Sequence, residues 1–241
     1  MAASAARCWW RFFREVGSAT VIHVDLTPHA SRGASSLLWL NEEERARWRQ
    51  YPLPGSRRRF ALCRAALRAV LCRQLGCSNE RLTFGSSSYG KPFALVDNVP
   101  ATISFNLSHS GQHGLIAFAP QGRLGVDVEE RVARRDFDEL SEVVFGPHER
   151  SIIAFARGCD KVQLFFRLWT IKEALIKALG MGLSFDVSRF EVPSALRQGR
   201  MSLFRFPQLP EVCWRVEYIG NEEFSAAIAH EFLPSQFDDQ E

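Results

Sequence analysis

Apolar residues recur at helical spacing in two long stretches of the chain. One stripe runs through residues 56–75 and is followed by Gly76, and a second runs through residues 161–179 and is followed by Gly180. Because glycine adopts the left-handed conformation that ends many helices, both stretches are predicted to be long amphipathic helices. A shorter helix is predicted to begin after Asn41, which precedes three glutamates in a pattern that resembles a capping box.

Alternating and continuous apolar runs predict several β-strands. Residues 103–107 alternate apolar and polar side chains, residues 114–119 form an apolar run, and the SHSGQ segment between them is expected to be a hairpin loop. Further strands are predicted at residues 124–129, 185–192, 201–206, 212–219 and 224–230. This order of elements predicts an α+β fold and not regular βαβ alternation.

The predicted elements fall into two comparable groups. Each half of the chain contains one long amphipathic helix and several strands, and a boundary is expected near Gly122 to Gly125. The predicted halves are residues 1–123 and 124–241. At 241 residues, the chain is long enough for two small, closely packed units or one large domain.

Composition limits the classes of partner. Hydrophobic residues make up 46% and charged residues 24%, which is typical of a soluble globular protein, and no apolar run is long enough for a membrane span. A net charge of +3 is too small to indicate a nucleic-acid-coating protein. The arginines concentrate between Arg45 and Arg73, which predicts a phosphate-bearing or acidic partner. Six cysteines without a CxxC pair, and an N-terminus without a signal core, predict a reducing, cytoplasmic location.

Two carboxylates share one face of the strand predicted at 124–129. In the segment GVDVEE, strand alternation places Asp127 and Glu129 on the face opposite Val126 and Val128. Their Cα atoms then lie roughly 7 Å apart, and their repulsion at an effective dielectric of about 20 is on the order of 2 kcal/mol. A bound cation would relieve this repulsion, and oxygen-only ligands favour magnesium, calcium or manganese. A solvated strand face is the alternative interpretation.

The helix predicted at 161–179 carries a third carboxylate and a lysine. Trp169, Glu173 and Lys177 share a face beside the apolar stripe. One interpretation is an ordinary i,i+4 ion pair between Glu173 and Lys177, worth about 0.3–0.5 kcal/mol. The other is a site for magnesium and a diphosphate, because a metal and an ammonium group both neutralise charge on a leaving phosphate.

Three further residues are candidates for contacts with a phosphate. Ser108 and His109 lie at the end of a predicted strand, just before Gly111, and Lys91 lies in the turn segment YGKP. Taken alone, each is typical of a turn. Residues 105–111 hold no Asp or Glu to complete a hydrolase triad, and the chain contains neither a GxxxxGK[ST] phosphate loop nor a GxGxxG fingerprint.

Four motifs follow one another along the chain, namely YGKP at 89–92, FNLSHSG at 105–111, GVDVEE at 125–130 and FFRLWTIKEALIKALGMG at 165–182. Their order and spacing resemble the 4′-phosphopantetheinyl transferases of the surfactin-synthetase-activator type. The resemblance extends from about Arg47 to about Val192. It implies a pseudo-dimer of two similar α+β halves, with coenzyme A bound in the cleft between them.

The resemblance also implies roles for individual residues. Asp127, Glu129 and Glu173 are expected to hold Mg²⁺, and Lys177 is expected to stabilise the diphosphate of coenzyme A. The implied coenzyme A contacts are Arg47, Arg64, Lys91, Ser108 and His109. Of these, Arg64 and His109 are directed to the ribose 3′-phosphate in the family, and Arg47 is the loosest match.

The reaction implied by the resemblance is attack by a serine hydroxyl of an apo acyl or peptidyl carrier protein on the β-phosphorus of coenzyme A. It releases 3′,5′-adenosine bisphosphate, with Glu173 accepting the serine proton directly or through a water. A carrier that presents an acidic helix, a monomeric enzyme, and no nucleic-acid or membrane partner are expected. Two alternatives stay open, a non-catalytic coenzyme A-binding module and a metal-dependent hydrolase.

Overall fold

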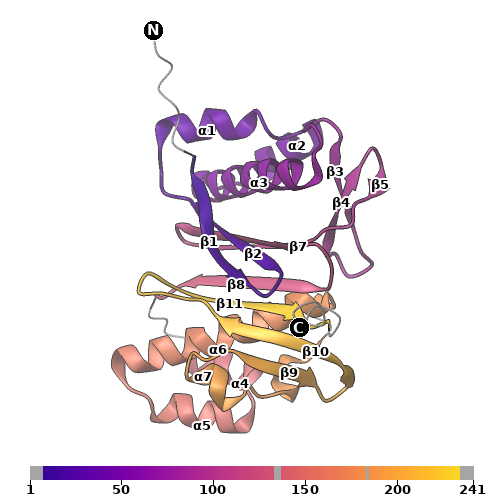
Figure 1. The fold of residues 1–241 in the computed structure, drawn as a ribbon. Coiled ribbons are helices and arrows are strands. Elements are labelled where there is room, and N and C mark those ends of the chain that lie inside the picture. The colour runs from indigo at the N-terminus through magenta and orange to yellow at the C-terminus, as the bar shows by residue number, and fades with distance from the viewer. Residues whose placement is uncertain (1–7, 133–136, 183–184, 234–241) are drawn as a thin grey trace.

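Two four-stranded antiparallel sheets stacked on each other form the centre of the molecule, with helices on both outer sides (Figure 1). The computed structural model describes residues 8–132, 137–182 and 185–233. The layers therefore run helix, sheet, sheet, helix. Each sheet belongs to one half of the chain, and each half contributes one helix of 22 residues. The expected α+β fold of two similar halves is confirmed.

The N-terminal sheet has the strand order β1-β2-β7-β6. Its strands are β1 (Trp10–Val16), β2 (Ala19–Asp25), β6 (Ser104–Ser110) and β7 (His113–Ala119). Helix α3 (Pro54–Leu75) covers its outer face, with the shorter helices α1 (Ala30–Leu37) and α2 (Glu42–Gln50) beside it (Figure 1). Side chains from α3 and the sheet form one apolar core, which includes Leu62, Leu67, Leu71, Phe105 and Ile116.

A small three-stranded sheet extends from the N-terminal half (Figure 1). It consists of β3 (Leu82–Ser86), β4 (Pro92–Val96) and β5 (Val99–Pro100). The turn between β3 and β4 carries Tyr89, Gly90 and Lys91 of the YGKP motif, and Pro92 begins β4. The motif is therefore placed at the edge of the N-terminal half, on the side that faces the C-terminal half.

The C-terminal sheet has the strand order β8-β11-β10-β9. Its strands are β8 (Leu124–Glu130), β9 (Ser202–Phe206), β10 (Leu209–Tyr218) and β11 (Phe224–Glu231). Helix α6 (Gly158–Leu179) packs on its outer face, with α4 (Phe137–Val144), α5 (Pro147–Phe155) and α7 (Ser194–Arg197) around it (Figure 1). We propose the turn between β7 and β8 as the boundary of the two halves, in keeping with a division after residue 123.

A third apolar cluster joins the two sheets. It is made of side chains no more than 2% exposed, which are Val16, Ala19, Val21, Leu115, Ala117, Ala119, Leu124, Val126, Val128, Ile219, Phe224, Ala226 and Ile228. Most come from β2, β7, β8 and β11. Because alanine and valine dominate, the two sheets approach closely, and the halves are held together by burial of apolar surface.

Most predicted elements are confirmed. The two long helices begin two or three residues earlier than predicted, and Asn41 forms both hydrogen bonds of the predicted capping box at α2. Among the strands, those predicted at 114–119, 124–129, 201–206, 212–219 and 224–230 are present with small shifts of their ends. No helix in the described ranges has the length and apolar character needed to cross a bilayer.

Two predictions were wrong. No strand covers residues 185–192, where the described chain instead forms a 3-10 helix, η2 (Val187–Arg189), because the Asp186 side chain accepts hydrogen bonds from the backbone and hydroxyl of Ser188. The SHSGQ segment is not a loop, because β6 continues to Ser110 and only Gly111 and Gln112 form the turn. Its serines look like loop residues in the sequence, but their hydroxyl groups donate hydrogen bonds to the carboxylates of β8.

Candidate active site

Strand β8 contributes the first two site residues. Asp127 pairs in register with Ala227 of β11, and Glu129 pairs with Ser225. The side chain of Asp127 is buried, at 2% exposure, so a solvated strand face is the wrong interpretation for this residue. A buried carboxylate requires a cation or several hydrogen-bond donors to be tolerated.

Helix α6 lies close enough to β8 to place its polar side chains beside Asp127. The close approach depends on Gly125, because a Cβ at this position would come 2.1 Å from the carbonyl oxygen of Ala174 and 2.3 Å from the backbone nitrogen of Ala178. Glu173 and Lys177 lie on the same stretch of α6 as these two alanines. The packing of one helix on one glycine therefore positions both predicted catalytic side chains.

Lys177 contacts side chains of strands β8 and β6. Its Nζ lies 2.6 Å from Asp127 Oδ1 and donates a hydrogen bond of 3.0 Å to Ser108 Oγ. The ordinary i,i+4 pair with Glu173 is not formed among the described residues, so that interpretation of the motif was wrong. Since an ammonium group has three protons, two are used here and the third is left for a ligand.

Strand β6 supplies hydroxyl groups to both carboxylates of β8. Ser108 Oγ donates to Asp127 Oδ1 over 2.8 Å, and Ser110 Oγ donates to Glu129 Oε2 over 2.7 Å. Because residues two apart share a strand face, the two serines match the two carboxylates one to one. Ser108 thus lies within the carboxylate site, in hydrogen-bond contact with two other site residues.

The three carboxylates affect one another. Burial raises the pKa of Asp127, Glu129 and Glu173 above the usual range, and the charge of Asp127 raises the pKa values of both glutamates further. The cation of Lys177 acts in the opposite direction on all three. One lysine therefore offsets part of the repulsion among three acidic groups.

A groove connects this cluster to the arginine-rich helices, and its first cavity lies between the two halves. The groove consists of three cavities that share lining residues, of about 560, 140 and 350 Å³. The first cavity is lined by Glu173, Lys177 and Lys91, and it shares Asn106 with the second. The second cavity is lined by His109 and Arg64, and it shares Arg64 with the third. Arg47 lines the third. Asp127 and Glu129 line none of the three cavities. Lys177, which lines the first cavity, contacts Asp127 directly.

Arg64 lies at the junction of the second and third cavities. Its guanidinium lies 4.7 Å from the ring centre of Phe84 and 5.8 Å from that of Phe60, which indicates cation–π contacts. Arg47 is exposed and lies over the same Phe60 ring at 5.6 Å. The two arginines place positive charge at the end of the groove opposite Glu173.

Two family models match the chain in succession. Residues 26–121 match the N-terminal region of 4′-phosphopantetheinyl transferases, and residues 123–229 match the 4′-phosphopantetheinyl transferase superfamily. The chain belongs to the 4′-phosphopantetheinyl transferase superfamily. The two matched regions together take in every motif of the groove.

Several relatives carry the family name. The chain is 39% identical over 145 residues to a putative 4′-phosphopantetheinyl transferase of Synechocystis and 34% identical over 145 residues to the 4′-phosphopantetheinyl transferase HetI of Nostoc. Each alignment covers 60% of this chain, and 58% and 61% of those proteins. The 4′-phosphopantetheinyl transferase Sfp of Bacillus subtilis is 26% identical over 215 residues, which is 88% of this chain and 92% of that protein.

In this member of the superfamily, Lys91 bridges the two halves. Its Nζ donates hydrogen bonds to the carbonyl oxygens of Leu124, over 2.9 Å, and Ala178, over 3.0 Å. Burial and the nearby charge of Arg123 lower the pKa of Lys91 to about 8. The lysine lines the first cavity, but its ammonium group is engaged by the backbone of the C-terminal half.

His109 lines the second cavity of the groove and is close enough to Arg59 and Lys177 to be affected by their charges. Its ring is exposed on β6, yet the protein atoms around it desolvate the imidazole and lower its pKa, and the charges of Arg59 and Lys177 lower it further. The neutral ring can accept a hydrogen bond, and an approaching phosphate favours the charged form. Arg59 was not predicted as a site residue, because nothing in the arginine-rich run distinguishes it from its neighbours.

Asn106 is a residue of the groove that was not predicted from the sequence. Its side-chain oxygen accepts a hydrogen bond of 3.0 Å from the backbone nitrogen of Val126, which fixes β6 against β8. Positions 106, 108 and 110 all bond to β8, so the polar face of β6 was the available signal. It was hidden by the expectation that β6 ends before Ser108.

The carboxylate cluster fits a divalent cation in its donor chemistry. Asp127 Oδ2 is buried and makes no hydrogen bond within the part of the chain that the structure describes. Carboxylate oxygens that repel one another are the donors that Mg²⁺ prefers. Across the described residues, however, no group of three or more His, Cys, Asp or Glu side chains is arranged so that it could hold a metal ion. The cluster therefore supplies suitable donor atoms, but its side chains are not gathered around one metal position.

Proposed function

We propose that this chain transfers 4′-phosphopantetheine from coenzyme A to a serine of an apo acyl or peptidyl carrier protein. The groove supports this function best, because it joins the arginines Arg47 and Arg64 at one end to the cluster of Asp127, Glu173 and Lys177 at the other. A ligand with a phosphate at each of two separated positions matches that distribution of charge. The names of the matching families and relatives agree with this activity.

The proposed reaction forms one bond and breaks one bond. The carrier serine oxygen bonds to the β-phosphorus of coenzyme A, and the bond from that phosphorus to the bridging diphosphate oxygen breaks. The leaving group is 3′,5′-adenosine bisphosphate. We assign the serine proton to Glu173, directly or through a water, because burial and the charge of Asp127 raise the pKa of this carboxyl and make it a better base.

Lys177 is the residue proposed to stabilise the diphosphate of coenzyme A and the phosphate that leaves with 3′,5′-adenosine bisphosphate. Asp127 and Ser108 hold two of its protons in place, and its side chain lines the same cavity as Glu173. A cation fixed in this way needs no reorganisation when negative charge develops. Arg47, Arg64, Lys91, Ser108 and His109 are proposed as further contacts for coenzyme A.

Asp127, Glu129 and Glu173 are the residues that would hold Mg²⁺. When bound, the ion supplies further charge neutralisation at the diphosphate. The buried, unpartnered Asp127 Oδ2 supports this assignment. The chain's own contribution is to keep Asp127 and Glu129 oriented through Ser108 and Ser110.

The carrier is proposed to present an acidic helix to basic and apolar residues beside the groove, and the enzyme is proposed to act as a cytoplasmic monomer without nucleic-acid or membrane partners. Binding between oppositely charged surfaces weakens as salt screens them. The affinity for an apo carrier is therefore expected to fall between low and physiological salt. An affinity that does not depend on ionic strength would indicate a mainly apolar contact instead.

Mass spectrometry of an apo carrier incubated with the full chain, Mg²⁺ and coenzyme A tests the proposal. The expected result is a carrier heavier by one phosphopantetheine group, with 3′,5′-adenosine bisphosphate as the second product. Free phosphopantetheine formed without a carrier would identify a hydrolase. Coenzyme A that binds but stays intact would identify a binding module.

A further inference from the structure

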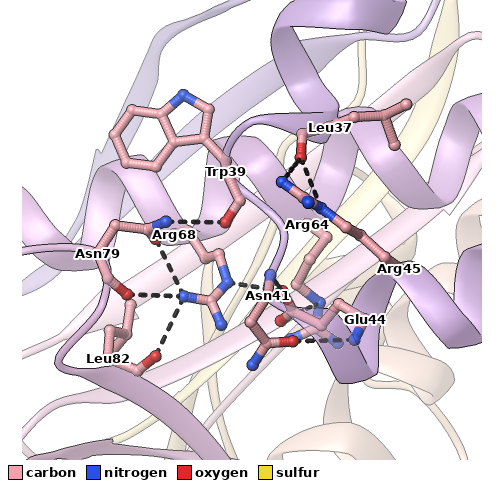
Figure 2. Close-up of polar contacts among 9 residues, drawn as sticks. All are labelled: Leu37, Trp39, Asn41, Glu44, Arg45, Arg64, Arg68, Asn79 and Leu82. Carbon is pink, nitrogen blue, oxygen red and sulfur yellow. Dashed lines mark hydrogen bonds and ion pairs between the residues drawn. The ribbon is translucent and has the colours of Figure 1, made fainter.

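A buried carboxylate outside the catalytic cluster contacts one of the groove arginines. Glu44, in the first turn of α2, is 8% exposed. Its Oε1 lies 3.5 Å from Arg64 Nε and makes no hydrogen bond among the described residues (Figure 2). In the sequence, Glu44 is recognisable only as one of the three glutamates that follow Asn41 in the predicted capping box.

Glu44 itself is held from two sides. Its Oε2 accepts a hydrogen bond of 3.1 Å from the backbone nitrogen of Asn41 and one of 2.7 Å from Arg68 Nε (Figure 2). The Glu44 backbone nitrogen in turn donates to Asn41 Oδ1 over 2.9 Å. The carboxylate is therefore fixed both by the capping box of α2 and by a side chain of α3.

Arg68 anchors this arrangement to the rest of the N-terminal half. It is fully buried, and its Nη1 donates to the carbonyl oxygen of Asn79, to Asn79 Oδ1 and to the carbonyl oxygen of Leu82 over 3.0–3.1 Å (Figure 2). Asn79 Nδ2 donates to the carbonyl oxygen of Trp39. Since a buried charge is costly without a partner, Glu44 also serves as the counter-ion of Arg68.

The single negative charge of Glu44 does not neutralise all the arginines around it, so positive charge remains at Arg64. Glu44 neutralises the buried Arg68, so the positive charges of Arg64 and Arg47 are left over, and both face the third cavity. The ion pair of Glu44 with Arg64 joins Oε1 and Nε, and Arg64 makes no side-chain hydrogen bond within the described residues. One face of the guanidinium lies on Phe84, and the side chain lines the second and third cavities.

We propose that Glu44 is a positioning residue, which holds Arg64 ready for the 3′-phosphate and so sets the preference for coenzyme A over 3′-dephospho-coenzyme A. This inference rests on the proposed function, in which Arg64 contacts that phosphate. An arginine loses considerable rotamer freedom when it binds a ligand. A side chain that is already ordered before binding avoids that loss, and the ligand binds more tightly.

Calorimetric titration of the full chain with coenzyme A and with 3′-dephospho-coenzyme A tests this role without relying on turnover. Glu44→Gln keeps the shape of the side chain and the capping box, in which glutamine is also accepted. We expect it to weaken the binding of coenzyme A about tenfold and to leave the binding of the dephospho compound unchanged. Glu42→Gln, an exposed change in the same helical turn, is the matched control and is expected to alter neither affinity.

A second variant controls for unfolding that an unpaired Arg68 could cause. Glu44→Gln combined with Arg68→Met removes both charges of the buried pair, a change that proteins often tolerate, and still leaves Arg64 without its acceptor. Because Arg64 loses its ion-pair partner in this variant as well, the same selective loss is expected. In an Arg64→Gln background, Glu44→Gln is expected to have no further effect on either ligand.

The outcomes separate this inference from the proposed function. If the wild-type chain does not bind coenzyme A more tightly than the dephospho compound, the assignment of Arg64 to the 3′-phosphate fails. If the wild type discriminates and Glu44→Gln discriminates equally or better, Glu44 merely screens the positive charge and the positioning role is overturned. A selective loss in both Glu44 variants supports the role.

Discussion

Gly125 of β8 faces the backbone of Ala174 on α6 with no room for a side chain, because a Cβ would come 2.1 Å from the Ala174 oxygen. Neither backbone can yield without moving the helix or the strand. The active-site groups of α6 are therefore positioned by a residue that has no side chain.

Gly125→Ala is expected to lower the free energy of unfolding by about 1–3 kcal/mol, the usual cost of overpacking, and to reduce turnover more than tenfold. Turnover falls because α6 must shift, and Glu173 and Lys177 move with it. Chemical denaturation and carrier modification rates measure the two effects.

Gly33→Ala provides the control for this change. Gly33 lies in α1, and a Cβ there would meet nothing within 4 Å. Alanine in an open helix is favoured over glycine by roughly 0.5–1 kcal/mol, so stability is expected to rise and activity to stay the same. Full activity and stability in Gly125→Ala would show that α6 is not fixed by this contact.

Lys177→Ala is expected to reduce kcat strongly and to destabilise the fold by about 1–3 kcal/mol, because it leaves the buried Asp127 carboxylate without its cation. Lys161→Ala is the matched control on the same helix. Lys161 pairs with the exposed Asp138, and such surface pairs contribute about 0–1 kcal/mol. Equal kcat values in the wild type and Lys177→Ala would show that Lys177 is a structural cation only.

Glu173→Gln is expected to abolish turnover while coenzyme A still binds. The amide has nearly the same shape as the carboxyl group but cannot accept the serine proton. Rapid-quench kinetics would measure the chemical step, and calorimetry would measure the affinities for coenzyme A and Mg²⁺. A variant that turns over at the wild-type rate would remove Glu173 from the role of base.

Lys91→Met distinguishes two roles of one side chain. The loss of its hydrogen bonds to Leu124 and Ala178 is expected to lower stability by on the order of 2 kcal/mol, because a charged donor is removed from two buried acceptors. If Lys91 also contacts coenzyme A, the KM for coenzyme A rises as well. Thermal unfolding and a KM measurement on the same preparation separate a bridge between the halves from a substrate contact.

The fold is expected to lose stability as the pH falls from 6.5 to about 4. His23 is buried against Phe224, and burial with the charges of His113 and Arg11 lowers its pKa to about 4, while Asp25 and Glu223 act in the opposite direction. In this window the unfolded chain binds a proton that the folded chain does not, so stability falls with pH, by about 1.4 kcal/mol per unit at most.

His23→Phe tests this pH dependence, because phenylalanine keeps the ring and cannot take up a proton. Denaturant midpoints of this variant are expected to vary less between pH 4 and 6.5 than those of the wild type. The same slope in both proteins would show that other groups cause the acid sensitivity.

The sequence predicted the elements that carry a strong periodic signal. Helix α6 and strand β8 were predicted within a few residues, because their apolar spacing is regular and glycines mark the ends. Strand alternation also placed Asp127 and Glu129 on one face. The partner of Lys177 could not be predicted, because Ser108 and Asp127 come from strands that are paired only through the packing of two sheets.

Other features left no local signal. Strands β1 and β2 were not predicted, since Arg11, Arg14 and His23 interrupt their alternation and their apolar face packs against a distant part of the chain. The serines of β6 were taken for loop residues, because their hydrogen bonds to carboxylates nineteen residues away do not appear in a local pattern. The role of Glu44 toward Arg64 was hidden for the same reason.

The tight contact between the two sheets determines how substrates can enter and leave. Buried valine, alanine and leucine side chains from both halves pack together there, mainly on the strands β2, β7, β8 and β11, and His23 of β2 stacks on Phe224 of β11. Hinged opening would expose this apolar surface to solvent, at a cost comparable to partial unfolding. Ligand exchange is therefore expected to depend on rearrangement of side chains along the rim of the groove, while the two halves move together as one rigid body.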